Sequence, residues 1–160
     1  MKTLITVNNP ELAQLIFHGE ALERLKSISE VDWLEDPGEL EARIGDYDAC
    51  ISSWGSPKIT QRVLTKAERL KFIGHAAGTV VPYVDEEVFG REITVVNANS
   101  VLSKATAEGT ITMMAAGAYC LPEYSRMLDN GGWANNDNEF VSGLTHQTIG
   151  LIGYEISPGR

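Results

Sequence analysis

Short apolar runs alternate with amphipathic stretches over the first hundred residues. Runs rich in β-branched and aromatic residues predict strands over 3–7, 31–35, 47–55, 70–78 and 93–99. Leucine and isoleucine at helical spacing, together with turn residues, predict helices over 10–29, 39–46, 60–70 and 83–92. Strands and helices that alternate in this way predict an α/β fold with an open, mostly parallel sheet and helices on both faces.

The pattern changes near residue 99. Residues 100–130 form one long helical segment rich in Ala, Gly and Met, which Pro122 is expected to kink or interrupt. A polar loop follows, and the apolar run 148–152 then predicts a last strand that leads into Gly153. A long helix between a complete sheet and the first strand of another unit predicts two domains, 1–98 and 99–160.

Composition narrows the class of protein. With 160 residues and 43% hydrophobic content, the chain can bury one core and carry an appendage. A net charge of -9 argues against binding nucleic acid or an anionic membrane through a basic surface. No run is long enough for a signal peptide or a membrane span, and two cysteines, Cys50 and Cys120, suggest core residues rather than a disulfide framework. We expect a cytoplasmic protein.

The loops after the predicted strands are the places to look for a ligand site, because parallel sheets bind ligands at the carboxyl ends of their strands. The loops are 52–56, 75–79 and 97–100. Small residues beside Gly78 would expose backbone N–H groups, which suit a carboxylate or a phosphate. Alternatively, Gly78 only permits a tight turn. Trp54 is more often a packing residue, although it stands where it could line a pocket.

Other candidate groups give weaker signals. His75 stands at a strand end, where a catalytic role is the minority interpretation. Asp85, Glu86 and Glu87 lie together on a short predicted helix and are expected to be solvated. The sequence has no nucleophile elbow, no phosphate-binding P-loop and no zinc-ligand spacing, so we predict no metal site.

The C-terminal residues begin a pattern that they do not continue. A dinucleotide fingerprint needs G-x-G-x-x-G after a strand, and Glu155 stands where the second glycine after Gly153 belongs. A carboxylate there would crowd and repel a phosphate, and Pro158 would fall in the first turns of the required helix. We therefore expect a truncated or altered start of a dinucleotide-binding unit.

The order of the motifs resembles a known family. "HAAGTVV" at 75–81, "NANSVLSKATAEGTITMMAAGAY" at 97–119, "GGW" at 131–133 and "QTIGLIGY" at 147–154 are similar to the N-terminal half of the D-isomer-specific 2-hydroxyacid dehydrogenases. The resemblance covers nearly the whole chain. It is strongest over 97–108, where Asn99 and Ser100 replace the usual Pro-Gly, and Arg126, Gly132 and Trp133 add to it.

This resemblance implies a flavodoxin-like substrate domain, a crossing helix and the first strand of an incomplete Rossmann domain. It implies that the substrate carboxylate contacts backbone N–H groups of the loop Ala77, Gly78 and Thr79. Trp54 is a candidate substrate contact because of its place at a strand end. On the cofactor side, the resemblance implies that Thr106 lies against the nicotinamide of NAD or NADP, with Leu102 nearby and Gly153 at the phosphate turn.

The implied reaction is hydride transfer between C2 of a small 2-hydroxy or 2-keto acid and the nicotinamide. The Arg and the His–Glu pair that such enzymes use come later than the fingerprint, so we expect no catalytic residue and no turnover in this chain alone. The alternative is a non-catalytic module that binds a small carboxylate or a partner. A phospho-receiver domain is disfavoured, because Asn8-Asn9 and Ser52-Ser53 stand where acids are required.

A homodimer through the 103–128 helix is a further expectation. The segment carries more apolar surface than one small domain would cover. The resemblance to the family also implies a homodimer.

Overall fold

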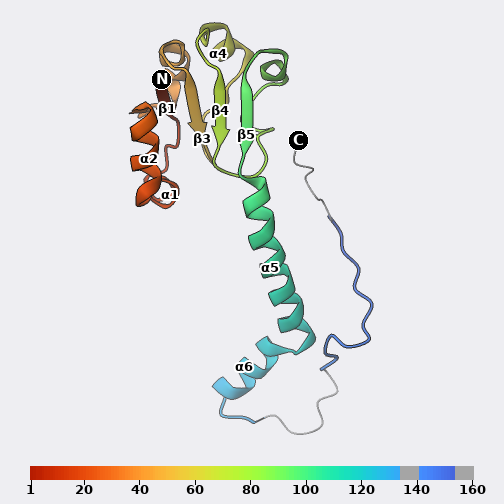
Figure 1. Ribbon diagram of the computed structural model, residues 1–160. Helices are drawn as coiled ribbons and strands as arrows, with labels where there is room; N and C mark the ends of the chain where they lie inside the picture. The colour runs from red at the N-terminus through yellow and green to blue at the C-terminus, as the bar shows by residue number, and fades with distance from the viewer. Residues whose placement is uncertain (134–140, 154–160) are drawn as a thin grey trace. The chain divides into compact units, whose positions relative to one another are not determined.

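A computed structural model describes residues 1–133 and 141–153. Its sheet has five parallel strands in the order β2-β1-β3-β4-β5, and the arrows of β3, β4 and β5 run in one direction in Figure 1. This is the flavodoxin-like strand order, so the predicted α/β class is confirmed. The strands are β1 (Lys2–Ile5), β2 (Glu30–Trp33), β3 (Ala49–Ser52), β4 (Phe72–His75) and β5 (Thr94–Asn97).

The helices are shorter than the sequence pattern suggests. The α-helices are α1 (Pro10–Ile16), α2 (Glu20–Ile28), α3 (Leu40–Arg43), α4 (Gln61–Lys66), α5 (Asn99–Ala118) and α6 (Leu121–Asp129). Short 3-10 helices complete the set: η1 (Pro37–Glu39), η2 (Ile44–Asp46) and η3 (Glu86–Gly90). The predicted helix over 39–46 is therefore half α-helix and half 3-10 helix, and the predicted helix over 83–92 contains only the 3-10 helix η3.

The single helix predicted over 10–29 is wrong, because two helices occupy this range. Asn9 caps α1 by accepting hydrogen bonds from the backbone N–H groups of Glu11 and Leu12. Gly19 then adopts φ of +54°, a conformation that interrupts a right-handed helix and that glycine tolerates. His18 accordingly lies in the connecting turn and not on a helix.

One face of the sheet carries the main hydrophobic core. The strand register places Leu4, Cys50, Ile73 and Val95 side by side across four strands. The first three are fully buried, and they pack with apolar residues of α3, η2, α4 and η3: Leu40, Ile44, Val63, Leu64 and Val88. Burial raises the pKa of the Cys50 thiol to about 12, so Cys50 is an inert core residue as predicted.

The opposite face is covered by α1 and α2 over β1 and β2. Side chains alternate along a strand, so Thr3 points away from the Leu4 face. The Thr3 hydroxyl lies 2.6 Å from the hydroxyl of Ser29, the residue that follows α2. Phe17, at the end of α1, packs edge-on against Trp33 of β2, with the ring centroids 5.2 Å apart. Helices therefore cover both faces of the sheet.

The chain divides into two compact units, Met1–Ser100 and Val101–Arg160. In the second unit, α5 ends at Ala118 and α6 begins at Leu121, with Pro122 in its first turn, so the predicted interruption is present. Cys120 joins the two helices with φ of +51°. It is only partly buried and lies outside the core cluster, which corrects its assignment as a core residue.

The strand predicted over 148–152 is not formed. These residues have no strand assignment, and Leu151 and Ile152 are exposed. A parallel strand exists only through hydrogen bonds to a neighbouring strand. No described residue supplies one for this segment. The local apolar pattern is therefore insufficient to form the strand.

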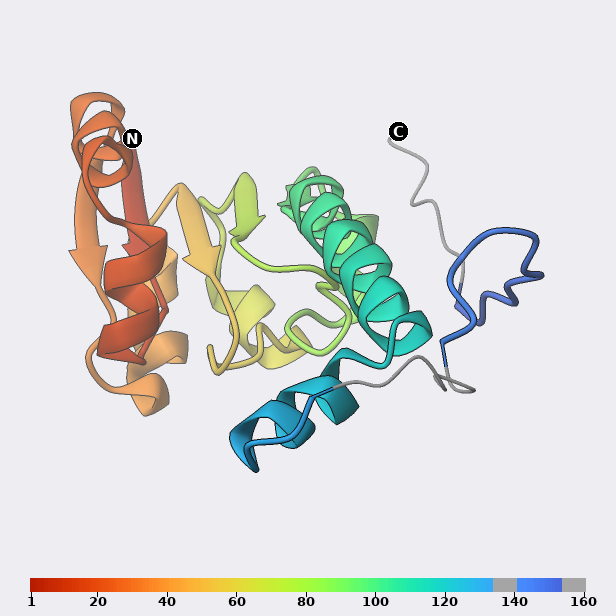
Figure 2. The same ribbon diagram turned by 90° about the horizontal axis from the view of Figure 1, so that it is seen from below.

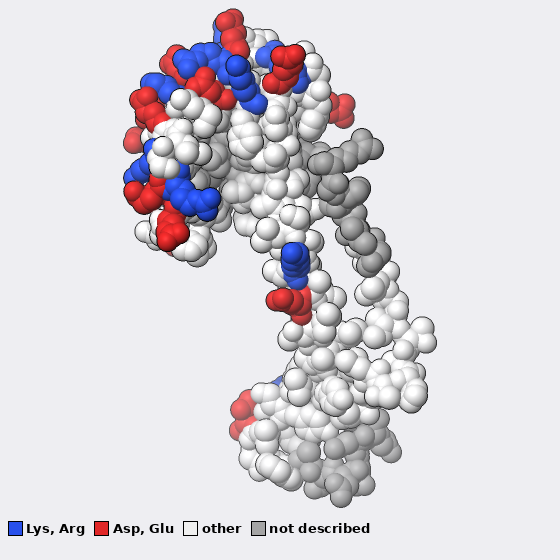
Figure 3. Space-filling model, viewed as in Figure 1, with Lys and Arg blue, Asp and Glu red and all other residues white. Residues whose placement is uncertain are grey.

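Charge is distributed unevenly along the chain. Lys, Arg, Asp and Glu are interspersed over the surface of residues 1–100, whereas α5 carries one lysine and one glutamate, Lys104 and Glu108 (Figure 3). Within the described residues, the helices are too short or too polar to cross a membrane.

The core makes a first prediction about stability. Ile73 is fully buried at the centre of the core row, so we expect Ile73→Ala to lower the free energy of unfolding by about 2–5 kcal/mol. Chemical denaturation monitored by circular dichroism measures this value. Leu15→Ala is the control, because Leu15 is exposed, and it should change stability by less than about 0.5 kcal/mol. Similar losses in the two variants would contradict this description of the core.

Candidate functional site

The site is built at the carboxyl ends of β1, β3, β4 and β5. Because all strands are parallel, these ends lie along one edge of the sheet, and the view in Figure 2 faces the end toward which the arrows of Figure 1 point. The register pairs Ser52 of β3 with His75 of β4, and His75 with Asn97 of β5. Polar residues that end neighbouring strands therefore meet at this edge.

Three hydrogen bonds join the loops that follow β3 and β4. The Ser52 hydroxyl and His75 Nδ1 share one, with the two atoms 2.9 Å apart. The backbone N–H of Ala76 donates to the Ser52 carbonyl at 2.7 Å, and the Ser53 hydroxyl donates to the Ala76 carbonyl at 3.1 Å. Ser52, Ser53 and His75 are buried, so these bonds satisfy polar groups that water cannot reach.

Ser56 connects the β3 loop to β1. Its hydroxyl donates to the Thr6 carbonyl at 2.9 Å and accepts from the backbone N–H of Ser53 at the same distance. On the other side, the backbone N–H of Ala98 donates to the Ala77 carbonyl at 2.9 Å, which joins the β5 end to the β4 loop. The loops of four strands thus form one hydrogen-bonded edge.

Tyr83 completes this edge. Its ring stacks on the imidazole of His75, with centroids 4.5 Å apart and planes inclined by 32°. The Tyr83 hydroxyl accepts a hydrogen bond from the backbone N–H of Gly55 at 3.3 Å. No sequence motif marks Tyr83 as a site residue. Its only signal was an aromatic residue a few positions after the small-residue loop.

His75 is a buried, neutral group and not a surface acid or base. Only 2% of the residue is exposed, and burial lowers the pKa of its imidazole from the ordinary value of 6.5. Its Nε2 is buried without a hydrogen-bond partner among the described residues. This burial argues against the minority interpretation of His75 as a catalytic residue and makes it a support for the loop that follows it.

That loop presents the anion-binding candidates. Gly78 is partly exposed and Thr79 is exposed, and their backbone N–H groups donate to no acceptor within the described part of the chain. Ala77 is fully buried, with its carbonyl bonded to Ala98. In this conformation, Gly78 and Thr79 offer donors at the surface while Ala77 anchors the loop below them. Such a pair of fixed donors suits a carboxylate.

Trp54 and Asp85 differ in the contacts that their side chains make. Trp54 follows β3 and is 51% exposed, so its indole is available at the same edge of the sheet. Asp85, Glu86 and Glu87 were expected to form a solvated acidic face; Glu86 and Glu87 are exposed, whereas Asp85 is partly exposed and makes two specific contacts. Its carboxylate pairs with Lys58 at 2.6 Å and accepts from the backbone N–H of Gln61 at 2.7 Å. Both contacts hold the pKa of Asp85 below its ordinary value.

The residues predicted for the cofactor lie in the second unit. Thr106 and Leu102 are one turn apart on α5, and the Thr106 hydroxyl donates to the Leu102 carbonyl at 3.0 Å. Gly153 is exposed and adopts φ of +83°. Glu155 and Pro158 lie outside the described residues. Over residues 1–133 and 141–153, no three or more His, Cys, Asp or Glu residues are grouped to hold a metal ion.

Comparison with known proteins identifies the family. Residues 12–156 match the family described as D-isomer specific 2-hydroxyacid dehydrogenase, catalytic domain. The chain therefore belongs to the D-isomer-specific 2-hydroxyacid dehydrogenase family, and the resemblance inferred from the motifs is confirmed.

Individual relatives are longer than this chain. It is 34% identical over 139 residues to D-3-phosphoglycerate dehydrogenase of Methanocaldococcus jannaschii, covering 85% of this chain and 26% of that protein. It is 24% identical to glyoxylate reductase of Thermococcus litoralis, covering 96% of this chain and 47% of the relative. The chain thus spans about a quarter to a half of these relatives.

Solved structures agree on the fold. The PH0520 protein from Pyrococcus horikoshii OT3 matches with a TM-score of 0.67 and 29% identity, over 87% of this chain and 40% of that one. An acyclic imino acid reductase in complex with NADPH and D-Arg matches with a TM-score of 0.65, over 89% of this chain and 45% of that one. At 18% identity, the second likeness concerns the fold alone.

The buried imidazole makes a prediction about pH. Because the pKa of His75 is lower in the folded state than the ordinary 6.5, the unfolded chain binds a proton more readily. The free energy of unfolding should therefore be highest above pH 6.5 and fall as the pH drops toward the folded-state pKa. His75→Gln should lose this part of the pH dependence. Denaturant titrations at several pH values between 7.5 and 5 test it.

His18→Gln is the matched control, because His18 is an exposed histidine whose Nδ1 bonds only the nearby carbonyl of Leu15. It should keep the wild-type dependence on pH. If His75→Gln and His18→Gln gave the same curve, His75 would not be the buried neutral group described above.

Proposed function

We propose that this chain carries the substrate-binding part of an NAD(P)-dependent 2-hydroxyacid dehydrogenase. The observation that supports this most directly is the pair of backbone donors at Gly78 and Thr79 on a loop fixed from below by His75 and Ala77. A 2-hydroxy or 2-keto acid carries one carboxylate, and two fixed N–H groups match its oxygens without a charged side chain. Trp54 is the candidate wall of the same site.

The cofactor side of the proposal rests on α5 and the segment around Gly153. Thr106 uses its hydroxyl within the helix, so its methyl group is what remains to contact a nicotinamide, beside the apolar Leu102. Gly153, with positive φ and open space around its Cα, fits a turn at which a backbone approaches a pyrophosphate. These features fit NAD or NADP, whose nicotinamide accepts or donates the hydride when bound.

The residues present in this chain decide which parts of the reaction it can supply. The reaction needs an acid/base and a cation that holds the keto oxygen. His75 is buried and neutral, so it supplies neither, and the second unit offers no described histidine with a carboxylate partner. We propose that the 160 residues bind the acid without turning it over, and that a protein containing this chain acts on small 2-hydroxy or 2-keto acids.

Binding of a small acid is directly testable. We expect glyoxylate and glycolate to shift the amide resonances of Gly78 and Thr79 in a ¹⁵N-labelled sample, while neutral glycolamide does so at least about tenfold more weakly. Thr79→Asp places a negative charge at the exposed edge of the loop and should weaken glyoxylate binding by about tenfold or more.

Thr79→Asn is the control, since the Asn side chain has nearly the same shape as Asp but no charge. Its affinity for glyoxylate should stay within about twofold of the wild type. Equal binding of glycolate and glycolamide, or no shift at Gly78 and Thr79, would contradict the carboxylate assignment.

We further propose that α5 and α6, residues 103–128, form a homodimer interface. Described apolar side chains of these helices are exposed, among them Ile111 at 60% and Met113 at 77%, and α5 buries no residue. A helix with two charged residues and this much exposed apolar surface is typical of an interface.

The dimer can be tested by sedimentation. The wild-type chain should sediment as a dimer, and Ile111→Glu with Met113→Glu should sediment as a monomer, because the new carboxylates would have to be buried without partners. Ile111→Leu with Met113→Leu keeps the surface apolar and should remain dimeric. A wild-type monomer at high micromolar concentration would contradict the proposal.

A further inference from the structure

Tyr83 closes the turn that ends the carboxylate loop, defined as residues 76–80. Its backbone N–H donates to the Val80 carbonyl at 2.8 Å, and its own carbonyl accepts from the backbone N–H of Ile59 at 2.8 Å. Ile59 also forms an isolated parallel bridge with Val84, and both residues belong to the buried core cluster. The backbone of Tyr83 is therefore anchored on the core.

The Tyr83 side chain contacts both loops of the proposed acid site. Its ring stacks on the buried imidazole of His75, with the centroids 4.5 Å apart, so the residues before and after the carboxylate loop meet. Its hydroxyl accepts a hydrogen bond from the backbone N–H of Gly55, in the loop after β3, at 3.3 Å. Because the backbone and the ring are both held, the hydroxyl is a fixed acceptor for the β3 loop.

The tip of the β3 loop has little else to hold it. The hydroxyls of Ser53 and Ser56 anchor the base of this loop. The backbone N–H of Ser56 donates to the Ser53 carbonyl at 3.1 Å, which leaves Trp54 and Gly55 at the tip of a turn, with φ of +78° at Gly55. Within residues 1–133 and 141–153, the bond to the Tyr83 hydroxyl is the one hydrogen bond that this tip makes. The position of Trp54 relative to the carboxylate loop therefore depends on that hydroxyl.

We propose that Tyr83 is a positioning residue that sets the preference of the acid site for the side chain of a 2-keto acid. This role rests on the proposed function, in which Gly78 and Thr79 bind the carboxylate and Trp54 is a wall of the site. Carbon 2 of the acid joins the carboxylate to the side chain, so an acid held by its carboxylate presents its side chain beside the same loop. The Tyr83 hydroxyl fixes the wall that this side chain contacts and leaves the carboxylate donors unchanged.

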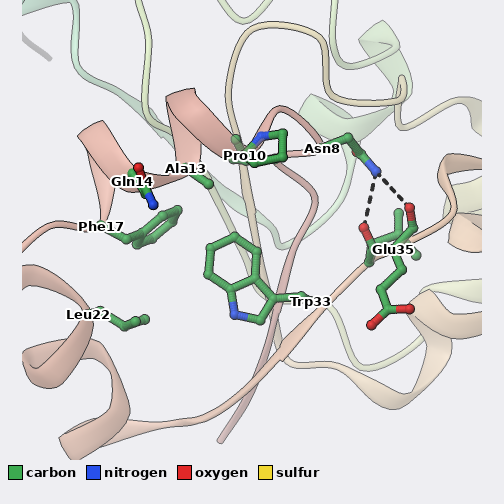
Figure 4. Close-up of a pocket in the computed structure, with 10 residues that line it drawn as sticks. Asn8, Pro10, Ala13, Gln14, Phe17, Leu22, Trp33 and Glu35 are labelled. Carbon is green, nitrogen blue, oxygen red and sulfur yellow. Dashed lines mark hydrogen bonds between the residues drawn. The ribbon is translucent and has the colours of Figure 1, made fainter.

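A cavity of about 450 Å³ beside Trp33 is an alternative place for such a side chain. Its lining comes from α1, α2 and the ends of β1 and β2, and in Figure 4 Phe17, Leu22 and Trp33 point toward a common space. The lining includes neither Trp54 nor Tyr83. A variant that fills this cavity therefore separates the two places.

Tyr83→Phe tests the role, because it removes the hydroxyl and keeps the ring that stacks on His75. The probes are glyoxylate, which has a hydrogen in place of a side chain, and 2-ketoisocaproate, which has a branched apolar one. We expect Tyr83→Phe to bind 2-ketoisocaproate about fivefold more weakly than the wild type and glyoxylate within about twofold, since only the larger acid needs an ordered wall. The Gly78 and Thr79 amide resonances in NMR titrations give both affinities. Faster hydrogen exchange at the Gly55 amide reports the lost bond.

Trp54→Ala is the second variant. It should weaken 2-ketoisocaproate binding at least as much as Tyr83→Phe does. Adding Tyr83→Phe to it should change the affinity by less than about twofold, because the hydroxyl acts through Trp54. Additive losses in the double variant would overturn the role.

Two controls separate this role from a loss of stability and from the Trp33 cavity. Tyr47→Phe removes a buried hydroxyl that bonds Asp32 and Arg43 and contacts neither loop. It should lower the free energy of unfolding and leave the ratio of the two affinities at the wild-type value. Ala13→Leu fills the cavity from α1 and should also leave that ratio unchanged.

The outcomes distinguish this role from the proposed function. A wild-type chain that binds neither acid at Gly78 and Thr79 would contradict the proposed function, and the role of Tyr83 would fall with it. Binding of glyoxylate alone, or of both acids with an unchanged ratio in Tyr83→Phe, would overturn the role of Tyr83 and leave the carboxylate site in place. A ratio that Tyr47→Phe or Ala13→Leu changes as much as Tyr83→Phe would overturn it as well.

Discussion

The structure depends on one constraint: buried polar groups at the ends of parallel strands must find hydrogen-bond partners. Parallel pairing brings four strand ends to the same edge, together with Ser52, Ser53, His75 and the main-chain groups beside them. The serines satisfy this requirement, because each hydroxyl can donate and accept at once. Ser56 does both, between the Thr6 carbonyl and the Ser53 N–H. The network cross-links the loops of neighbouring strands.

This cross-linking bears on the proposed carboxylate site. Donors that are already oriented bind an anion without the entropic cost of ordering a loop. The His75 imidazole contributes by stacking on Tyr83 and bonding Ser52, which holds the base of the loop that carries Gly78 and Thr79. The buried neutral histidine is thus structural support for the loop of the proposed carboxylate site. Its low pKa follows from the burial that this role requires.

The two faces of the sheet have different uses. The Leu4, Cys50 and Ile73 face is filled by apolar side chains and provides the stability of the first unit. The face beneath α1 and α2 borders the cavity next to Trp33.

Much of the fold and part of the site were determined by the sequence itself. Runs rich in β-branched and aromatic residues located the strands, apolar residues at helical spacing located most helices, and small residues after β4 marked the Gly78 loop, because these signals are local. The interruption at Pro122 was equally local, since proline cannot donate within a helix. The order of the motifs also identified the family.

Tertiary structure decided the rest. Only the register brought Ser52 to His75 and Tyr83, residues far apart in the sequence, and only packing showed His75 to be buried. The 148–152 run has a strand pattern without forming a strand, because a strand depends on a partner that its own residues do not specify. The same holds for the cavity beside Trp33, since its lining residues are neighbours in space, and a local sequence pattern does not contain them.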